Sequence, residues 1–551
     1  MISYLTKAFT LLLIPWLIWK LLGRFFGKSP LDVLPGPPSA SLLFGNIPKL
    51  YHSEGWDFHR EIFRKYGTTM QIKGALGERL LLTVDPKALH HIFVKDQWVY
   101  ECSDALMDRN NVYFGEGLLA TLNVQHRKQR KMLNPVFSIN HMREMIPLFY
   151  EVTDRLKTVL KKKVGNGSKE IDVLHWMTRT ALELIGQSGM GYSFDTLEDE
   201  NDYHPYSRSV KRFISLTGGP VGFFANQFAF HLAARFSFPR LKRFIVEHIP
   251  IQRVQDLKVV VDTMQQTSVE IIRAKQEAMR SCDPLVAAEM QNKKDIISIL
   301  MRANATASEE DRLTDSEVIG QVSSLVFAGM DTTSSALSRI LQLLATHPHV
   351  QEKLREEIKE SQINGQLNYD HLVNLPYLDA ICRETLRVYP PVNMSFLRTA
   401  RKDMILPLAN PVTGADGREI SEVLVPKGTN VIASAFGSNC NPDLWGPDSY
   451  EWKPERWLSP LPESVIEAHM PGIYSHLMTF MGGSRACIGF KFSQLEMKVV
   501  LSVLLSTFKF SLSDKEIAWT MNGIAGPYVK GADKTRPQLP MIMTALEKAE
   551  S

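Results

Sequence analysis

A stretch near the carboxyl end of the sequence, residues 480–489, limits most strongly what this chain can fold into. It reads FMGGSRACIG, and the residues after it predict a helix over 489–505. Cys487 therefore lies between a glycine-rich loop and a helix start, where free amides and the helix dipole favour a thiolate. Glycines let a backbone approach a flat cofactor closely, and Arg485 can pair with an anionic group on it. For the cysteine alone, a buried structural thiol is the alternative.

A long helix predicted over 314–346 carries a second motif. Thr314 and Glu317 form a capping box at its start, and helical periodicity continues to its end. Near the middle the chain reads AGMDTT over 328–333. An Asp–Thr pair inside a helix carries little information by itself, and Gly329 costs about 1 kcal/mol relative to alanine.

Two shorter segments, ETLR and PERW, each contain one glutamate and one arginine. The first lies in a helix predicted over 376–388, where Glu384 and Arg387 share a face. Taken alone, this pattern is typical of an exposed ion pair, which stabilises the folded state by less than about 1 kcal/mol. The second segment occupies residues 454–457.

The rest of the chain predicts a body that is mainly α with small β-sheets, an α+β fold without a visible domain boundary. A hairpin is expected over 68–84, and the clearest further helices are expected over 144–163 and 252–280. Short β-like runs occupy residues 394–435.

Together these motifs make the chain similar to the cytochrome P450 superfamily. The pattern F-x-x-G-x-R-x-C-x-G matches the haem-binding signature of that family at all five fixed positions. The resemblance implies the cytochrome P450 fold and haem b, with Cys487 as the iron's thiolate ligand, which pushes electron density onto the metal in this family. The cofactor-binding residues that it implies are Phe480, Gly483, Arg485, Gly489, Arg130, His126 and Arg398.

Within that set, the arginines are expected to bind the haem propionates, and Phe480 is expected to shield the sulfur. Arg398 follows a Pro–Pro pair at about the family's distance, and Arg130 ends the segment HRKQR. The family often has W-x-x-x-R there, whereas this chain has His126 in place of the tryptophan. His126 either donates a hydrogen bond to a propionate or faces solvent, and both alternatives stay open.

The resemblance also gives the long helix a catalytic role. Thr332 would donate a hydrogen bond to the oxygen being activated, and Asp331 would relay protons from solvent, which is a general-acid role. Gly329 would leave room for dioxygen.

The charged segments resemble the family's buried structural triad. Glu384, Arg387 and Arg456 would brace the loop that leads to the cysteine, without taking part in catalysis. Trp457 stands where the family more commonly has phenylalanine.

By family topology, substrate should contact residues from four separate segments. Their apolar walls with a few polar contacts suit a lipophilic small molecule, and packing of some of them in the core is the plain alternative. The expected pocket residues are Phe114, Leu118, Phe327, Ala328, Asn393, Met394 and Met521.

The predicted function is therefore a monooxygenase that hydroxylates, or oxidises in several steps, a terpenoid or other secondary metabolite. The chain resembles filamentous-fungal members of the family. Fatty-acid, sterol and xenobiotic hydroxylases are alternatives. A peroxide-using or isomerising haem-thiolate enzyme is a further one, against which Asp331 and Thr332 argue, and a non-catalytic haem protein is the last.

The amino terminus predicts a membrane anchor. Residues 8–22 read AFTLLLIPWLIWKLL, and extension to 5–26 brings the helix close to the roughly 30 Å hydrocarbon core. Basic residues follow it, which places the remainder in the cytosol, and a cleaved signal peptide is the alternative. We expect an anchor over 1–28, a Pro-rich hinge over 29–48 and a haem domain over 49–551, attached to the endoplasmic reticulum membrane by a single pass.

Charge and cysteine content exclude some classes of partner. The 63 basic and 59 acidic residues give a net charge of only +4, too mild to indicate nucleic-acid binding. The five cysteines include no C-x-x-C pair, so neither a zinc site nor a disulfide framework is indicated.

The electron donor implied by the resemblance is an NADPH–cytochrome P450 reductase, because little chain remains for a flavin or ferredoxin domain. Cytochrome b5 is a second candidate partner. A basic docking face is one interpretation of five residues, and a solvated helix surface is the other. These residues are Arg127, Lys128, Lys131, Lys491 and Lys498.

Overall fold

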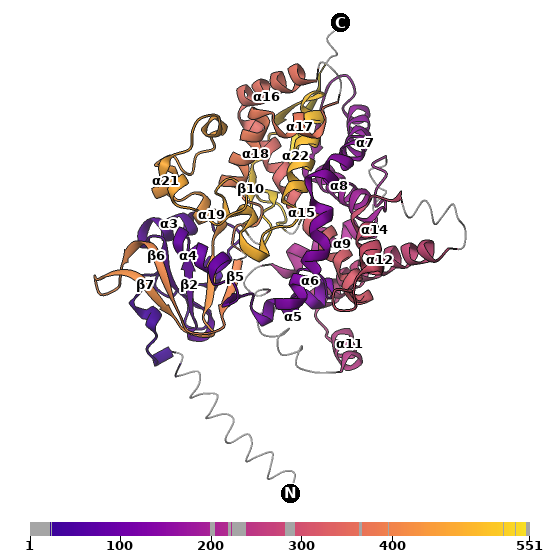
Figure 1. Cartoon of the computed structure of the whole chain (residues 1–551). Helices are drawn as coiled ribbons and strands as arrows, with labels where there is room; N and C mark the ends of the chain where they lie inside the picture. The colour runs from indigo at the N-terminus through magenta and orange to yellow at the C-terminus, as the bar shows by residue number, and fades with distance from the viewer. Residues whose placement is uncertain are drawn as a thin grey trace.

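The computed structural model describes most of the chain, namely residues 23, 25–198, 204–218, 222, 238–281, 292–362, 366–394, 396–521, 523–534 and 536–546. In these residues the fold is mainly helical with small sheets, as the sequence predicts. Figure 1 shows a five-stranded sheet and the β6–β7 hairpin on one side of a larger helical part.

Long helices make up the helical part. They are α3 (Trp56–Tyr66), α5 (Asp104–Phe114), α6 (Asn123–Leu133), α7 (Ile139–Val164), α8 (Val173–Ile185), α9 (Pro205–Thr217), α11 (Pro239–His248), α12 (Gln252–Arg280), α14 (Ile296–Thr306), α15 (Asp315–Thr346), α16 (Pro348–Ser361), α18 (Pro376–Val388) and α22 (Phe490–Leu505). Shorter helices are α2 (Ile47–Leu50), α4 (Pro86–His90), α17 (Tyr369–Val373), α19 (Ala435–Asn439), α20 (Pro442–Trp445) and α21 (Glu463–Glu467).

The strands form one five-stranded, one three-stranded and two two-stranded sheets among the described residues. The five-stranded sheet has the order β1 (Thr69–Lys73), β2 (Arg79–Thr83), β8 (Asn430–Ala433), β5 (Phe396–Ala400) and β3 (Tyr100–Glu101). The three-stranded sheet has the order β4 (Ser168–Asp172), β12 (Pro540–Ala545) and β9 (Phe508–Leu512). The two hairpins pair β6 (Met404–Thr413) with β7 (Glu419–Val425), and β10 (Ile517–Trp519) with β11 (Pro527–Val529).

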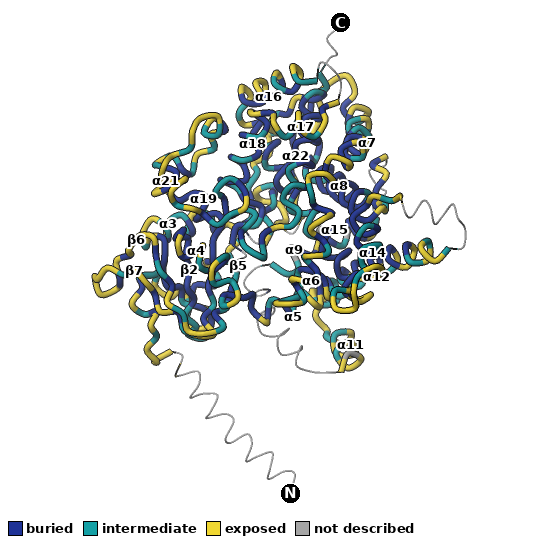
Figure 2. The backbone as a smooth tube through the Cα atoms, in the orientation of Figure 1, coloured by how far each residue is buried: buried dark blue, intermediate teal, exposed yellow. Residues whose placement is uncertain are grey.

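Helix α15 is the central element, and most of its residues are buried (Figure 2). Both hydrogen bonds of the predicted capping box are present, between Thr314 and Glu317. The Glu317 carboxylate also accepts hydrogen bonds from Gln129, at 2.9 Å, and from Gln125. One buried carboxylate therefore joins the start of α15 to α6.

The predicted amino-terminal parts have different outcomes. Nearly all of the predicted anchor lies outside the described residues, and no helix within them is both long and apolar enough to span a bilayer. The predicted hinge over 29–48 packs on the body. Leu31 and Leu34 are buried, and Asp32 accepts hydrogen bonds from Gln71 and Arg79 at 2.9 and 2.7 Å. The two buried leucines and the bidentate contact of Arg79 with Asp32 fix this segment to β1 and β2.

Candidate active site

The loop before Cys487 is held by short-range backbone contacts. The Cys487 amide donates a hydrogen bond to the Phe480 carbonyl at 2.8 Å, which closes the loop directly before α22. Gly483 has a φ of +68°, and a β-carbon there would lie 1.7 Å from the Phe93 carbonyl oxygen, so only glycine fits. Gly489 is the N-cap residue of α22. The predicted arrangement of loop, cysteine and helix is confirmed.

Cys487 differs from the other described cysteines in accessibility. It keeps an exposed surface, whereas Cys102, Cys382 and Cys440 are buried. The protein atoms around its sulfur raise the pKa of the thiol, while the Gly489 backbone and the positive charge of Arg130 lower it in part. For comparison, burial raises the pKa of Cys382 and of Cys440 to about 12. Cys487 is thus the described thiol best placed to bind an external partner.

Positive charge converges beside this loop from three elements. Arg130 of α6 donates a hydrogen bond to the Ala486 carbonyl, and Arg485 donates one to the Thr121 carbonyl at 2.7 Å. Arg398 of β5 is 4% exposed, and its Nη2 has no hydrogen-bond partner among the described residues. A buried guanidinium with an unused donor calls for an acceptor from outside the chain.

His126 lies within the same positive cluster. It is 5% exposed, so the solvent-facing alternative is wrong. Burial, together with the charges of Arg485, Arg130 and Arg398, lowers the pKa of His126 to about 3. The imidazole is therefore neutral at pH 7, and it is available as a hydrogen-bond donor in one tautomer.

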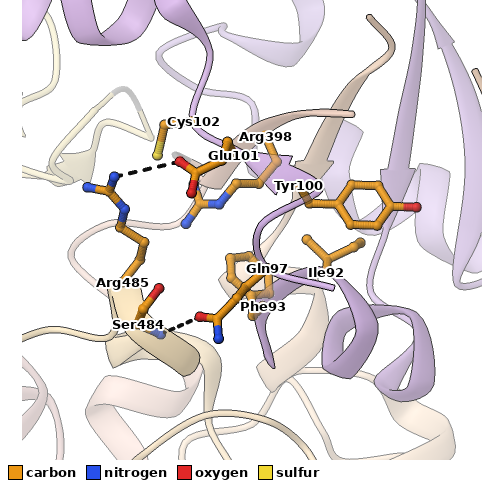
Figure 3. A pocket seen from close by; sticks show the side chains of 9 residues that line it. All are labelled: Ile92, Phe93, Gln97, Tyr100, Glu101, Cys102, Arg398, Ser484 and Arg485. Carbon is orange, nitrogen blue, oxygen red and sulfur yellow. Dashed lines mark hydrogen bonds and ion pairs between the residues drawn. The ribbon is translucent and has the colours of Figure 1, made fainter. Parts of the chain in front are cut away.

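One carboxylate approaches the cluster. Glu101 of β3 is buried and lies 3.7 Å from Arg485, and Figure 3 shows Arg398 pointing into the same space. Gln97 accepts a hydrogen bond from the Ser484 amide at 2.9 Å on the facing wall. The small cavity between them measures about 10 Å³, roughly room for one water molecule. A single carboxylate leaves the three arginines in excess positive charge.

The predicted catalytic pair lies near the middle of α15. The Thr332 hydroxyl donates a hydrogen bond to the Ala328 carbonyl at 2.7 Å, within its own helix. Asp331 lies close enough to Tyr206 of α9 to affect its ionisation. Burial, and then the negative charge of Asp331, raise the pKa of Tyr206. Tyr206, whose buried hydroxyl has no hydrogen-bond partner in the described part of the chain, is a neighbour that the sequence motifs did not indicate.

Gly329 lies where α15 packs closely on a neighbouring helix. A β-carbon on Gly329 would lie 3.2 Å from Ile185 of α8. This distance is tight, so the glycine serves the close packing of α8 on α15.

A buried glutamate faces α15 from α22. Glu496 is fully buried, and neither carboxylate oxygen has a hydrogen-bond partner of good geometry among the described residues. Burial raises the pKa of Glu496 well above its usual range, and the Thr333 hydroxyl opposes this only in part. Burial therefore favours the neutral carboxylic acid, and the Thr333 hydroxyl beside it adjoins the Asp331–Thr332 pair in sequence.

Replacing this acid with its uncharged isostere should change how stability depends on pH. Above pH 4.5 the unfolded chain releases the Glu496 proton while the folded chain retains it, so each pH unit costs about 1.4 kcal/mol up to the folded pKa. Glu496→Gln removes this cost. We expect the variant to unfold at a higher temperature than the wild type at pH 8 and at nearly the same temperature at pH 5, in thermal unfolding of the haem-loaded protein. An equal difference at both pH values would contradict the assignment.

The predicted triad forms as a buried cluster. Glu384 and Arg387 are fully buried and make two parallel hydrogen bonds of 2.8 Å. Arg456 lies 3.5 Å from the same carboxylate. The Trp457 indole N–H donates to Glu384 at 2.9 Å, which phenylalanine could not do. Arg387 also donates to the Asn439 carbonyl at 3.1 Å and thereby braces the segment before the cysteine loop.

The predicted substrate residues fall into two groups. Phe114 of α5 and Phe327 of α15 stack with ring centroids 4.7 Å apart, and Phe213 of α9 contacts both rings, at 5.7 and 5.1 Å. Leu118 donates its amide to Gln321 of α15 at 3.1 Å, and Ala328 lies one residue beyond Phe327. These residues therefore lie on or against α15, near the Asp331–Thr332 pair. Phe213 was not predicted, because no motif marks it.

The second group lies elsewhere. Met394 and Met521 belong to a separate apolar cluster around α3 and β1, apart from the core that contains Phe114 and Phe327. Asn393 is fully buried, and both amide atoms lack a hydrogen-bond partner among the described residues. Met394 and Met521 therefore pack apart from the aromatic group, and a pocket role for them and for Asn393 stays a prediction.

The prediction of a basic docking face is wrong for one of its residues. Lys498 is 1% exposed, and its ammonium donates hydrogen bonds to Asp379 at 2.7 Å and to the Val373 carbonyl at 2.8 Å. Lys498 of α22 therefore forms a buried structural ion pair with Asp379 and cannot contact a partner protein.

Comparison with known proteins identifies the family. The cytochrome P450 family model matches residues 35–526. A cytochrome P450 monooxygenase of Postia placenta is 50% identical over 530 residues, 96% of each chain. A ganoderic acid synthetase of Ganoderma lucidum is 44% identical over 538 residues, 96% of this chain and 97% of its own. A monooxygenase of Hericium erinaceus is 37% identical over 512 residues, 92% of each chain.

The chain therefore belongs to the cytochrome P450 family, whose members carry haem iron with a thiolate ligand. It is a cytochrome P450 monooxygenase.

The residues present fit such a cofactor. Haem needs a soft anionic ligand on its iron and counter-charges for its propionates. The accessible Cys487 offers the first, and Arg130, Arg398 and Arg485 offer the second through excess positive charge and an unused Arg398 donor.

Proposed function

We propose that the chain inserts one oxygen atom from O2 into a lipophilic small molecule, with Cys487 as the thiolate ligand of haem iron. The observation that carries the proposal is the convergence of Arg130, Arg398, Arg485 and a neutral His126 beside an accessible cysteine at a helix start. Haem supplies the oxygen-activating and electron-transfer chemistry when it is bound. We propose that electrons come from an NADPH–cytochrome P450 reductase, with cytochrome b5 as a second donor.

Each residue then has one task. Cys487 would hold the haem iron as a thiolate, since a metal-bound thiol is deprotonated. The arginines and His126 would hold the propionates, and the Phe480 carbonyl accepts a hydrogen bond from the Cys487 amide at 2.8 Å. Asp331 takes protons from solvent and passes them toward the Thr332 hydroxyl, which must leave its bond to the Ala328 carbonyl to donate elsewhere.

Thr332→Ala should separate haem binding from proton delivery. The variant is expected to keep the red-shifted Soret band of the reduced CO complex, because, among the described residues, the Thr332 hydroxyl bonds to a carbonyl of its own helix. Product formed per NADPH consumed should fall by about tenfold or more, since general-acid positioning contributes roughly 10²–10⁴-fold. NADPH oxidation, hydrogen peroxide and product are measured together. Thr333→Ala is the matched control, and coupling retained in Thr332→Ala would remove the role given to Thr332.

We propose a terpenoid or other secondary metabolite as the substrate. The aromatic group Phe114, Phe213 and Phe327 beside α15 supports an apolar substrate. A relative named as a ganoderic acid synthetase, covered almost end to end, supports the choice of class.

The substrate test uses the full chain with reductase and NADPH. A panel of terpenes, triterpenes and sterols is incubated beside fatty acids and aromatic xenobiotics, and products are extracted and analysed by mass spectrometry. We expect oxygenated products from the terpenoid arm. Turnover of a fatty acid without turnover of any terpenoid would overturn the substrate class while leaving the monooxygenase function intact.

We propose that residues 1–28 form a single membrane anchor and that the haem domain faces the cytosol at the endoplasmic reticulum. Exposed apolar side chains on the described body support contact with a membrane, and the α11 region and the amino-terminal segment lie toward the same edge in Figure 1. These side chains are Leu42, Leu43, Phe44, Phe238, Leu241, Phe244 and Ile245.

The anchor is tested by membrane fractionation. The full chain should stay in the pellet after alkaline carbonate extraction, and a chain lacking residues 1–28 should be released at least in part. The sequons at Asn166, Asn304 and Asn393 should carry no glycan in the proposed topology. A glycan on any of them would place the body in the lumen.

A further inference from the structure

A cavity that shares no lining residue with the cysteine loop lies between α3, the carboxyl half of α15 and the β10–β11 hairpin. It measures about 670 Å³, within the range of small-molecule sites. Its walls include Trp56, Arg60, Arg339, Tyr389, Trp519 and Tyr528.

Arg339 is the central charge of this cavity. Its guanidinium lies 3.7 Å from the Trp519 ring centroid and 4.2 Å from the Tyr389 ring centroid, so aromatic rings hold it by cation–π contact. The guanidinium's N–H donors lie along its edge and not on its faces. The residue is only partly exposed, and burial lowers the pKa of Arg339 to about 9, so it remains charged at pH 7.

The other charges in the cavity wall have partners. Lys534 pairs with Glu54 at 2.5 Å, and Lys530 pairs with Glu516. Within the part of the chain that the structure describes, Arg339 has neither a carboxylate partner nor a hydrogen-bond acceptor. Arg339 is partly exposed and lines the cavity, so its N–H groups can meet a molecule bound there. The aromatic contacts position this guanidinium but leave its donors unused, which points to an anion from outside the chain.

We propose that this cavity binds a small, flat organic carboxylate, whose carboxylate group pairs with Arg339 and whose apolar body lies against Trp56 and Ile517. A guanidinium fork matches a carboxylate in two parallel hydrogen bonds. Arg339 follows Thr332 by seven residues on α15, about 10 Å along the helix axis, so the site is separate from the reacting centre. The proposal goes beyond the monooxygenase function and does not depend on it.

The first test uses a matched pair of probes on the haem-loaded full chain. Isothermal titration calorimetry with 2-naphthoate should give saturable binding, and neutral 2-naphthylmethanol, which lacks the carboxylate, should bind about tenfold more weakly or worse. The Soret band should not shift on addition of 2-naphthoate. Equal binding of the two probes, no binding of 2-naphthoate, or a Soret shift that tracks its binding would overturn the proposal.

The second test identifies the residue. Arg339→Gln should weaken 2-naphthoate binding by about tenfold or more. Arg339→Lys keeps the charge and should bind more tightly than Arg339→Gln. Arg60→Gln is the control, because Arg60 lines the same cavity but its Nη1 pairs with Asp57 at 3.4 Å and its Nε is buried, and it should bind like the wild type. The reduced-CO spectrum checks that each variant is folded. If Arg339→Gln does not fold, Arg339→Lys and the probe pair decide, and unchanged affinity in a folded Arg339→Gln would contradict the assignment.

Discussion

The Cys487→Ala variant is expected to lose the red-shifted Soret band of the reduced CO complex and all NADPH-dependent product formation. Alanine cannot supply a thiolate, and no other described cysteine is exposed to replace it. The loop itself should survive, because the backbone bond from residue 487 to the Phe480 carbonyl does not involve the side chain. The expected effect is therefore on the cofactor and not on the fold.

Cys382→Ala is the matched control for this experiment. Cys382 is fully buried in α18, and burial raises the pKa of its thiol to about 12, so it is an inert packing residue. This variant should keep the band and the activity, with only a small loss of stability. A Cys487→Ala enzyme that retained the band would require a different iron ligand and would remove the basis of the proposed mechanism.

Glu384→Ala is expected to leave little folded, haem-containing protein. The carboxylate accepts two hydrogen bonds from Arg387, one from the Trp457 indole and one from the Lys453 amide. Its removal leaves Arg387 as a fully buried charge without its partner, at a cost of about 3–5 kcal/mol. A loss of that size approaches the whole stability of many domains. Soluble yield and the reduced-CO spectrum of the purified fraction measure it.

Trp457→Phe provides a graded comparison. It removes one donor from the same carboxylate, keeps the Glu384–Arg387 pair, and should cost about 1–3 kcal/mol. Denaturant unfolding of the haem-loaded protein would resolve the difference from the wild type. If Glu384→Ala folded as well as Trp457→Phe, the cluster would not brace the segment before the cysteine.

Local signals predicted the boundaries of several elements. The capping box at Thr314 and Glu317 gave the start of α15, and the proline at 376 gave the start of α18. The glycine-rich loop, the cysteine and the start of α22 were predicted together because all their determinants lie within a few residues. Caps, prolines and glycines act over one or two helical turns, so element boundaries that depend on them can be predicted from the sequence.

Features that depend on distant partners were predicted less well. His126 proved to be buried near arginines from β5 and the cysteine loop, and Lys498 proved to be buried against Asp379 of α18. A β-carbon on Gly329 would crowd Ile185, which is far away in the chain. Met394 and Met521 joined a different apolar cluster from Phe114 because the β10–β11 region packs toward α3. In each case the deciding contact comes from an element remote in sequence.

The Glu317 carboxylate has a consequence for cofactor loading. It caps α15 and also accepts hydrogen bonds from α6, the helix that carries His126 and Arg130. A tilt of α6 would therefore break hydrogen bonds to the first turn of α15. We expect the start of α15 and the helix that carries His126 and Arg130 to open together, so that loosening of one would disturb the helix that carries Asp331 and Thr332.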